Sequence, residues 1–280
     1  MRADLHIHTT ASDGRVAPAR TVRYAAAGDL DIIAITDHDT ATGVQEAERE
    51  AASAGVQVIA GLEISCRWED GMEVHLLGYG IDPAHPEIAG LQMAARQRRE
   101  KRMREMVSRL QSLDIEVTMA QVEAVAGGDE GSTLSRAHLA QVLLQEGHIT
   151  RFAEAFDRFI GEGRPGFVST PLPSLADAVA TVHRSGGLAV WAHPPLGILA
   201  DRLPAFVDAG LDGVEAYRSN LTPAEISRAV EVATAHDCLV TGGSDWHGRP
   251  GHRLGAFALG RSTLGPFLER LSAAPPVNRG

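Results

Sequence analysis

Three consecutive stretches near the N-terminus, ADLHI (3–7), PARTVRYAAA (18–27) and DIIAI (31–35), decide the fold. The first and third are short apolar runs that read as strands, and the second reads as a helix with Pro18 near its first turn. Strands that alternate with helices in this way are typical of βα units around a parallel sheet. The opening of the chain therefore predicts an α/β fold.

The alternation of strands and helices continues on both sides of a central interruption. Further strands are expected at 56–64, 73–79, 188–191, 213–216 and 238–241, with helices at 40–54, 174–183, 199–209 and 223–235. About seven strands with intervening helices predict a distorted (β/α)7 barrel.

The central interruption differs, because residues from about 87 to 164 show helical periodicity and no convincing strand. Apolar residues that recur every three or four positions indicate an amphipathic helix there, namely Met103, Met106, Val107, Leu110 and Leu113. Thr118 with Gln121 predicts the start of a second helix, and 135–145 a third. We therefore divide the chain into a first barrel part (1–86), a helical insertion (87–166) and a second barrel part (167–280).

The composition is that of a soluble globular protein, with 44% hydrophobic and 22% charged residues and a net charge of −10 over 280 residues. An acidic chain is not expected to bind duplex DNA, which needs clustered positive charge. Cys66 and Cys238 are too few for a disulfide framework. Since there is also no apolar run of membrane-spanning length and no signal peptide, we expect a cytoplasmic protein without a membrane partner.

Imidazole and carboxylate groups fall at the ends of nearly every predicted strand. These groups are His6, His8, Asp37, His38, Glu63, His75, His193, Asp245 and His247. In parallel barrels the carboxyl ends of the strands form one rim, so we expect these side chains to meet. A single histidine is more often a core or surface residue, but repetition at successive strand ends disfavours that interpretation here.

This donor set indicates metal binding. Neutral imidazole and carboxylate oxygen suit Zn, Mn or Fe, and the absence of positioned thiolates disfavours a structural zinc site. Six histidines and three carboxylates also exceed the needs of one ion. Two or three divalent ions that share bridging carboxylates would use them.

The same residues lie in motifs that resemble those of the PHP (polymerase and histidinol phosphatase) metallophosphoesterases. The motifs are HIHTTASDG (6–14), ITDHD (35–39), GLEIS (61–65), VH (74–75), AHP (192–194) and GSDWH (243–247). TLSRAHLAQVL (133–143), in the helical insertion, resembles the subgroup of nucleotide 3′,5′-bisphosphate phosphatases and 5′-to-3′ exoribonucleases.

The resemblance implies three metal ions. It places His6, His8, Glu63 and Asp245 on the first ion, Glu63, His75 and His193 on the second, and Asp13, His38 and His247 on the third. Asp13 stands where many relatives have histidine, and its harder oxygen favours Mn over Zn. Zn or Fe remain alternatives.

The expected reaction is hydrolysis of a phosphate ester, in which a metal-activated hydroxide attacks phosphorus. Asp245 or His247 is expected to act as general base or general acid, and the sequence does not choose between them. The resemblance implies that Glu63 is catalytic as the bridging ligand. Asp37 is predicted to orient the imidazole of His38 from behind. Glu215, at the end of the strand 213–216, either forms a salt bridge or contacts a substrate hydroxyl.

The helical insertion is predicted to supply substrate contacts. Ser135, Arg136 and His138 begin a helix, where N–H groups and a guanidinium hold a phosphate, although Ser135 could equally be a helix cap. Arg99 and Arg102 lie in a basic run that either attracts a short polyanionic strand or forms a solvated face. The expected substrate is a nucleoside 3′,5′-bisphosphate that loses its 3′-phosphate, or short 5′-phosphorylated single-stranded RNA, with no obligatory protein partner.

Three alternatives remain open. A histidinol-phosphate phosphatase would share the fold but is disfavoured by the SRAH segment and the basic helix. A non-catalytic regulatory PHP module is disfavoured because the ligand set is complete. A related amidohydrolase that cleaves C–N bonds would carry a bridging lysine, and no lysine lies near these motifs.

Overall fold

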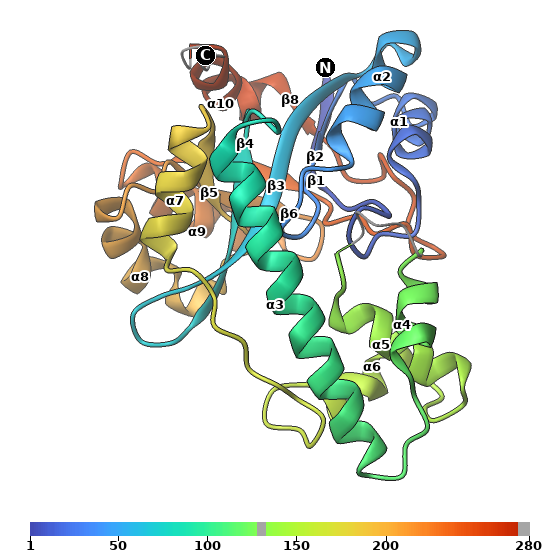
Figure 1. The fold of residues 1–280 in the computed structure, drawn as a ribbon. Helices are drawn as coiled ribbons and strands as arrows, with labels where there is room; N and C mark the ends of the chain where they lie inside the picture. The colour runs from blue at the N-terminus through green and yellow to red at the C-terminus, as the bar shows by residue number, and fades with distance from the viewer. Residues whose placement is uncertain (128–132, 274–280) are drawn as a thin grey trace. The chain divides into compact units, whose positions relative to one another are not determined.

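The computed structural model describes residues 1–127 and 133–273, and the chain forms two compact units (Figure 1). One unit contains residues 1–90 and 172–280, and the other contains residues 91–171. We refer to them as the barrel unit and the helical unit. No helix in the described ranges is both long and apolar enough to cross a membrane.

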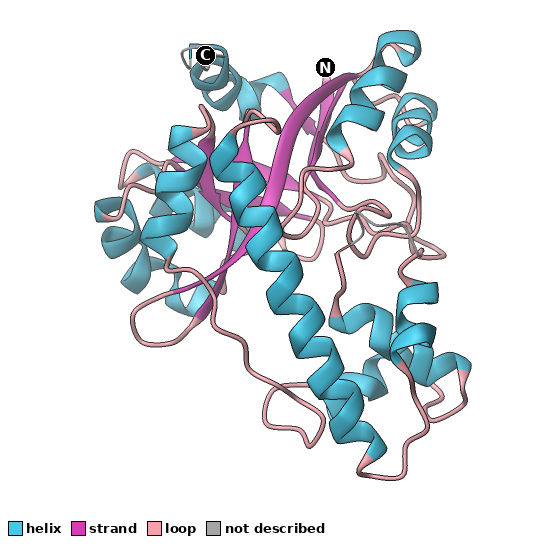
Figure 2. Ribbon diagram, viewed as in Figure 1, coloured by secondary structure: helices cyan, strands magenta, loops and turns pink. Residues whose placement is uncertain are grey.

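The barrel unit is built on one eight-stranded sheet (Figure 2). Its strands are β1 (Arg2–Ile7), β2 (Ile32–Ile35), β3 (Gln57–Arg67), β4 (Glu73–Tyr79), β5 (Leu188–Trp191), β6 (Gly213–Arg218), β7 (Leu239–Gly243) and β8 (Leu259–Gly260), in the order β7-β6-β5-β4-β3-β2-β1-β8. Backbone hydrogen bonds from His8 N to Trp246 O and from Trp246 N to His6 O join the ends of β1 and β7. These bonds nearly close the sheet, which confirms the predicted distorted barrel.

Close approach of the backbones at this junction requires glycine. A Cβ atom on Gly243, at the end of β7, would lie 2.4 Å from Cβ of His6. Contacts of that length do not occur between real side chains, so a larger residue would push β7 away from β1. Gly243 therefore brings the last strand of the barrel against the first metal-ligand motif.

Helices of the barrel unit pack one apolar face on the sheet. They are α1 (Pro18–Ala27), α2 (Val44–Ala54), α7 (Leu175–Arg184), α8 (Leu196–Asp208), α9 (Pro223–Thr234) and α10 (Arg261–Ala273). In α7 the buried residues Leu175, Ala178, Val179 and Val182 follow the helical repeat, and Ser174 caps the first turn by accepting a hydrogen bond from Asp177 N. The predicted helices are thus present, although α2 begins at Val44 rather than at residue 40.

The sheet differs from the prediction in the direction of one strand. β4 is antiparallel to both β3 and β5, whereas a fully parallel arrangement was expected. Only residues 68–72 connect β3 to β4, and a tight turn with a hydrogen bond from Trp68 N to Met72 O closes them. A parallel connection needs a crossover of a dozen or more residues, so this short link forces a hairpin. The two-residue strand β8 and the helix α10 were also not expected.

The helical unit has its own apolar core. It contains most of α3 (Pro86–Gln111), together with α4 (Met119–Val125), α5 (Arg136–Gln145), α6 (Phe152–Ala155) and a π-helical turn (Phe156–Ile160). Four residues of the predicted apolar stripe of α3 are buried in this core, namely Met103, Met106, Val107 and Leu110. Leu113, the fifth, lies beyond the end of the helix and is 45% exposed, because α3 ends at Gln111.

Candidate metal centre

The strands of the barrel bring donor side chains to one end of the sheet. His6 lies in β1, Glu63 in β3 and His75 in β4, whereas His8, His38, His193, Asp245 and His247 lie in the loops that follow β1, β2, β5 and β7. His75 is near the start of β4 rather than its end. Because β4 runs antiparallel, its start lies at the rim formed by the ends of the parallel strands. The reversed strand therefore still delivers its histidine to the cluster.

The carboxylate of Glu63 is at the centre of this cluster. The side chain is only 1% exposed and faces imidazoles on both oxygens. Oε1 lies 2.8 Å from His193 Nε2 and 3.0 Å from His75 Nδ1, and Oε2 lies 3.0 Å from His38 Nδ1, 3.3 Å from His8 Nε2 and 3.5 Å from His6 Nε2. A carboxylate in this position has the geometry of a bridging ligand.

Two further carboxylates flank Glu63. Asp245 Oδ1 lies 3.2 Å from His8 Nε2 and 3.5 Å from His6 Nε2. Asp13 Oδ1 lies 3.4 Å from His247 Nε2 and 4.0 Å from His38 Nε2. The cluster therefore contains three acids among six imidazoles.

Within the described ranges, four groups of donor atoms lie close enough together to hold an ion, each with its atoms within 4.8 Å of one another. The groups are His8–Asp13–His38–His247, His6–His8–Asp245, His6–Glu63–His193 and His38–Glu63–His75. Together they comprise all nine metal ligands expected from the sequence. The sets differ in detail, since Glu63 groups separately with His193 and with His75.

Several donor atoms are buried and lie close to other polar atoms of the cluster without the geometry of a hydrogen bond. In the described part of the chain these atoms include Glu63 Oε2 and the Nδ1 atoms of His8 and His38. Burial of an unpaired polar atom costs about 1–3 kcal/mol, so such atoms are uncommon in native proteins. Cation coordination would satisfy these lone pairs. The donor set therefore fits divalent metal ions.

The charges of the cluster act strongly on one another. Burial alone would raise the pKa of Glu63, but His38, His75 and His6 outweigh it and hold that pKa well below its usual range. Burial opposes protonation of His75 and His247, yet neighbouring carboxylates raise their pKa values to about 10 and about 9. Burial, helped by His247 and His38, lowers the pKa of His8 to about 3. In the ion-free protein, protons on His75 and His247 thus occupy positions that metal ions would take.

Glu215 lies directly behind two of the expected ligands. Its Oε1 lies 2.9 Å from His6 Nδ1, and its Oε2 accepts a hydrogen bond from the backbone N–H of His193 at 2.7 Å. Of the two roles considered for Glu215, the structure shows the ion pair. The carboxylate fixes the ring of His6 and the loop that carries His193, as outer partners of metal ligands commonly do.

Asp37 does not have the partner expected for it. Its carboxylate accepts hydrogen bonds from Thr9 N, Thr9 Oγ1 and Ser12 Oγ at 2.6–2.7 Å, rather than from the imidazole of His38. The loop after β1 folds over the end of β2, which places these donors nearer to Asp37 than its neighbour in sequence. Asp37 therefore holds the loop that leads to Asp13.

The backbone is strained at two of the expected ligands. Asp245 has φ of 52° and His193 has φ of 32°, in the left-handed region that residues with a Cβ atom avoid. Strain of this kind costs of the order of 1–3 kcal/mol and concentrates at functional sites.

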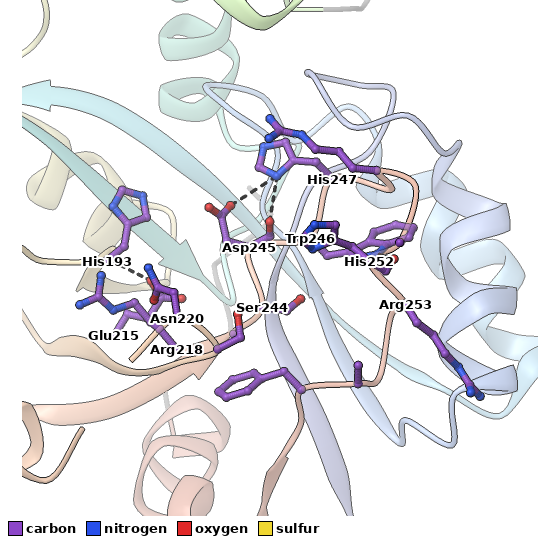
Figure 3. A pocket seen from close by; sticks show the side chains of 16 residues that line it. His193, Glu215, Arg218, Asn220, Ser244, Asp245, Trp246, His247, His252 and Arg253 are labelled. Atoms are coloured by element: carbon purple, nitrogen blue, oxygen red, sulfur yellow. Dashed lines mark hydrogen bonds and ion pairs between the residues drawn. The ribbon is translucent and has the colours of Figure 1, made fainter. Parts of the chain in front are cut away.

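A cavity of about 410 Å³ in the barrel unit opens beside the donor cluster (Figure 3). His193, Glu215, Arg218 and Asn220 lie on one side of it, and His247, Trp246 and His252 on the other, with Asp245 and Ser244 between them. Arg218 and His252 were not expected at a functional site. The signal available in the sequence was the basic segment HGRPGHR (247–253) directly after the last ligand motif.

The candidate substrate residues lie in the helical unit. Ser135 caps α5, since its Oγ accepts a hydrogen bond from Ala137 N, and its own N–H donates to His138 Nδ1. The guanidinium of Arg136 lies over the rings of Phe156 and Phe167. The structure thus shows a helix-capping arrangement, which leaves the predicted phosphate contact untested.

The two arginines of the basic run contact backbone carbonyl groups of the same unit. Arg99 donates to Leu134 O at 3.1 Å, and Arg102 donates to Val168 O at 2.8 Å. Arg102 also lies over the ring of Phe167. These contacts tie α3 to the segments on either side of α5.

Comparison with known proteins agrees with this site. The PHP domain matches residues 4–161. A 5′-3′ exoribonuclease of Haemophilus influenzae is 32% identical over 279 residues, which cover 98% of this chain and 97% of the relative. A 3′,5′-nucleoside bisphosphate phosphatase of Chromobacterium violaceum is 34% identical over 249 residues, which cover 87% of this chain and 86% of the relative. A solved structure from Bifidobacterium adolescentis, described as a metal-dependent phosphoesterase, has a TM-score of 0.86 and 33% identity, with 96% of each chain covered.

The chain therefore belongs to the PHP domain family, as its motifs predict. With the donor cluster on the barrel rim, this membership identifies a hydrolase of the metal-dependent phosphoesterase class.

Proposed function

We propose that the protein removes the 3′-phosphate from nucleoside 3′,5′-bisphosphates, and that it also cleaves short 5′-phosphorylated RNA from the 5′ end. The observation that carries the proposal is the placement of buried Glu63 between five imidazoles, which suits a carboxylate that bridges cations. The relatives named a bisphosphate phosphatase and an exoribonuclease support this choice of substrate.

We assign two or three divalent ions to the cluster. His6, His8, Glu63 and Asp245 would hold the first ion, Glu63, His75 and His193 the second, and Asp13, His38 and His247 the third. Manganese fits best, because the third set includes the hard oxygen of Asp13, and Zn or Fe would suit the imidazole-rich sets. When bound, such ions lower the pKa of a water molecule for attack on phosphorus and neutralise charge on the phosphoryl oxygens.

Asp245 is the group that moves the proton in this proposal. Its side chain is 50% exposed and lines the cavity, so it would be accessible to a bound substrate. His247 is only 13% exposed, and its Nδ1 lies 2.8 Å from Asp245 O, which leaves Nε2 directed at Asp13. His247 therefore serves better as a ligand than as the acid or base.

Ser135, Arg136 and His138 are proposed to receive the 5′-phosphate. Phosphate binds readily at a helix N-terminus, and the aromatic rings beneath Arg136 hold its guanidinium in a defined position. Arg99 and Arg102, in the basic run of α3, would contact a longer strand. Arg136→Ala is expected to raise KM for a bisphosphate more than KM for an aryl phosphate.

The proposal is tested by turnover on a matched panel. The Mn-loaded protein would be assayed with adenosine 3′,5′-bisphosphate, a 5′-phosphorylated dinucleotide, histidinol phosphate and an N-acyl substrate. We expect phosphate release from the bisphosphate and 5′-mononucleotide release from the dinucleotide. Activity confined to histidinol phosphate would overturn the proposed substrate. Cleavage of the N-acyl compound alone would overturn the reaction class.

A further inference from the structure

Asp4 is a buried carboxylate of the barrel that the metal assignment does not use. It lies in β1 two residues before His6, so the strand period places both side chains on the same face of the strand. The residue is 0% exposed. Burial strips a carboxylate of its hydration, and this cost must be offset by hydrogen bonds or by opposite charge. The contacts of Asp4 therefore show what the group holds in place.

Both oxygens of Asp4 bind Ser244, the first residue after β7. Oδ1 accepts a hydrogen bond from Ser244 N at 2.9 Å, and Oδ2 accepts one from Ser244 Oγ at 2.5 Å. Oδ1 also accepts a hydrogen bond from His6 N at 3.3 Å. Hydrogen bonds to a charged acceptor are about twice as strong as those between neutral groups. Asp4 thus fastens the end of β7 to β1.

Asp245 is consequently held from both sides. Ser244 precedes it, and Trp246 follows it. Trp246 is bound to the backbone of β1, since its N–H donates to His6 O at 3.2 Å and its O accepts a hydrogen bond from His8 N at 2.8 Å. Between these two fixed residues Asp245 has φ of 52°, which a residue with a Cβ atom retains only where its surroundings impose it. In this conformation its carboxylate lies 3.2 Å from His8 Nε2 and lines the cavity (Figure 3).

We infer that Asp4 is a positioning residue of the phosphoesterase reaction, which acts through Ser244 to hold the carboxylate of Asp245 beside the reacting phosphate. The inference rests on the proposed function in one respect, that Asp245 moves the proton. In that reaction the oxygen of water bonds to phosphorus, and the bond from phosphorus to the ester oxygen breaks. Asp245 takes a proton from the water and passes it to the ester oxygen. Proton transfer needs hydrogen-bond distance, so loosening Ser244 should slow this step more than it weakens binding.

The test compares two substrates that differ in their leaving group, at saturating Mn. 4-Nitrophenyl phosphate releases a weakly basic oxygen that departs without a proton, whereas phenyl phosphate releases a more basic oxygen that benefits from one. Ser244→Ala deletes the hydroxyl that Asp4 holds. Ser185→Ala is the matched control, because Ser185 is buried and its Oγ donates a hydrogen bond to Val182 O at 2.8 Å, but it precedes β5 and lies outside the cavity lining.

We expect Ser244→Ala to lower kcat for phenyl phosphate roughly fivefold more than kcat for 4-nitrophenyl phosphate, a part of the roughly 100-fold or more that a positioned acid contributes. KM should stay unchanged for both substrates. Ser185→Ala should leave the ratio of the two kcat values as it is, even where it lowers the free energy of unfolding.

Asp4→Asn connects the effect to Asp4 itself. The amide replaces the oxygen that accepts from the Ser244 hydroxyl, so the ratio should change in the same direction as in Ser244→Ala. The double variant should change the ratio no further than the larger single change, because both substitutions break one contact. Additive changes would refute the inference. If Asp4→Asn does not fold, the comparison of Ser244→Ala with Ser185→Ala decides alone.

Asp245→Asn separates this inference from the function beneath it. If Asp245→Asn slows both aryl phosphates equally, proton transfer by Asp245 is wrong and the inference falls with it. If Asp245→Asn slows phenyl phosphate more but Ser244→Ala does not, Asp245 keeps its role and the positioning role of Asp4 is refuted. An equal change of the ratio in Ser185→Ala also refutes it. Adenosine 3′,5′-bisphosphate is assayed in parallel, and its resistance to hydrolysis would overturn the proposed substrate alone.

Discussion

The apolar core of the helical unit and the rim of the barrel unit bury opposite kinds of side chain. The helical unit buries Met106, Leu110, Leu139 and Leu143 in a wholly apolar cluster, so its burial is favourable at about 25 cal/mol per Å². The rim of the barrel unit buries carboxylates and imidazoles, some of whose polar atoms have no hydrogen-bond partner among the residues that the structure describes. Burial of unpaired polar atoms costs free energy of folding. A region that accepts this cost is expected to be a functional site.

The largest effect that would sharpen this contrast is expected from Glu63→Gln. Removing the bridging charge should lower turnover by more than about 100-fold. A loss of about 100-fold is the most that is typical when a residue that only hydrogen-bonds to a metal ligand is replaced. Bound metal, measured by elemental analysis, should fall as well. Glu69→Gln, in the exposed turn between β3 and β4, is the control and should leave both unchanged. Full activity in Glu63→Gln would refute the metal assignment.

The opposite effect is expected in the helical unit. Leu143→Ala removes a fully buried side chain and should lower the free energy of unfolding by about 2–5 kcal/mol, measured with urea. Its metal content should match that of the unmodified protein. Leu113→Ala, where the side chain is 45% exposed, should cost far less. A loss of metal in Leu143→Ala with unchanged stability would break the contrast.

Glu215→Gln is expected to act on the rim more weakly than Glu63→Gln. The amide would weaken the interaction with His6 and leave an acceptor for the backbone of His193, so metal affinity should fall about 10- to 100-fold. Calorimetric titration with Mn measures this change. Glu231→Gln on exposed α9 serves for comparison. Equal affinities in Glu215→Gln and the unmodified protein would remove Glu215 from a positioning role.

The smallest expected effect is a difference in pH dependence between ion-free and Mn-loaded protein. Carboxylates raise the folded-state pKa of His75 to about 10 and that of His247 to about 9, although burial opposes the shift. The two protonated rings stabilise the folded state. This contribution is complete below pH 6.5, the pKa of histidine in the unfolded chain, and is lost as the pH rises through the folded-state pKa values of about 9 and about 10. Metal binding needs these rings neutral, so its contribution to stability grows over that window.

Urea unfolding between pH 6.5 and 9.5, with chelator or with Mn, would show the two slopes. We expect the free energy of unfolding to decline with pH in chelator and to decline less, or to rise, with Mn. Parallel slopes would show that ions and protons do not compete for these rings.

The sequence predicts the donor cluster well because strand ends are local features. His6 and His8 alternate at the end of an apolar run, and the strand period alone puts them on one face. The direction of β4 was not predictable from hydrophobic pattern, which is the same for parallel and antiparallel strands. It follows instead from the length of the connection at residues 68–72.

The cavity was beyond sequence reasoning for a different reason. Its lining combines the end of β6 with the irregular segment between β7 and β8, and no periodicity reports how such a segment folds. Asp37 shows the same limit, since its partners Thr9 and Ser12 are far away in sequence. Contacts made by loops depend on tertiary structure rather than on local pattern.

The donors are spread from His6 to His247, with the whole helical unit inserted between His75 and His193. During synthesis, the nascent chain lacks Asp245 and His247 until β7 and the loop that follows it have left the ribosome. The nascent protein therefore lacks a complete set of ligands until both halves of the barrel have emerged. Tight metal loading should mark finished molecules, and premature termination products should not sequester the cell's divalent metal ions.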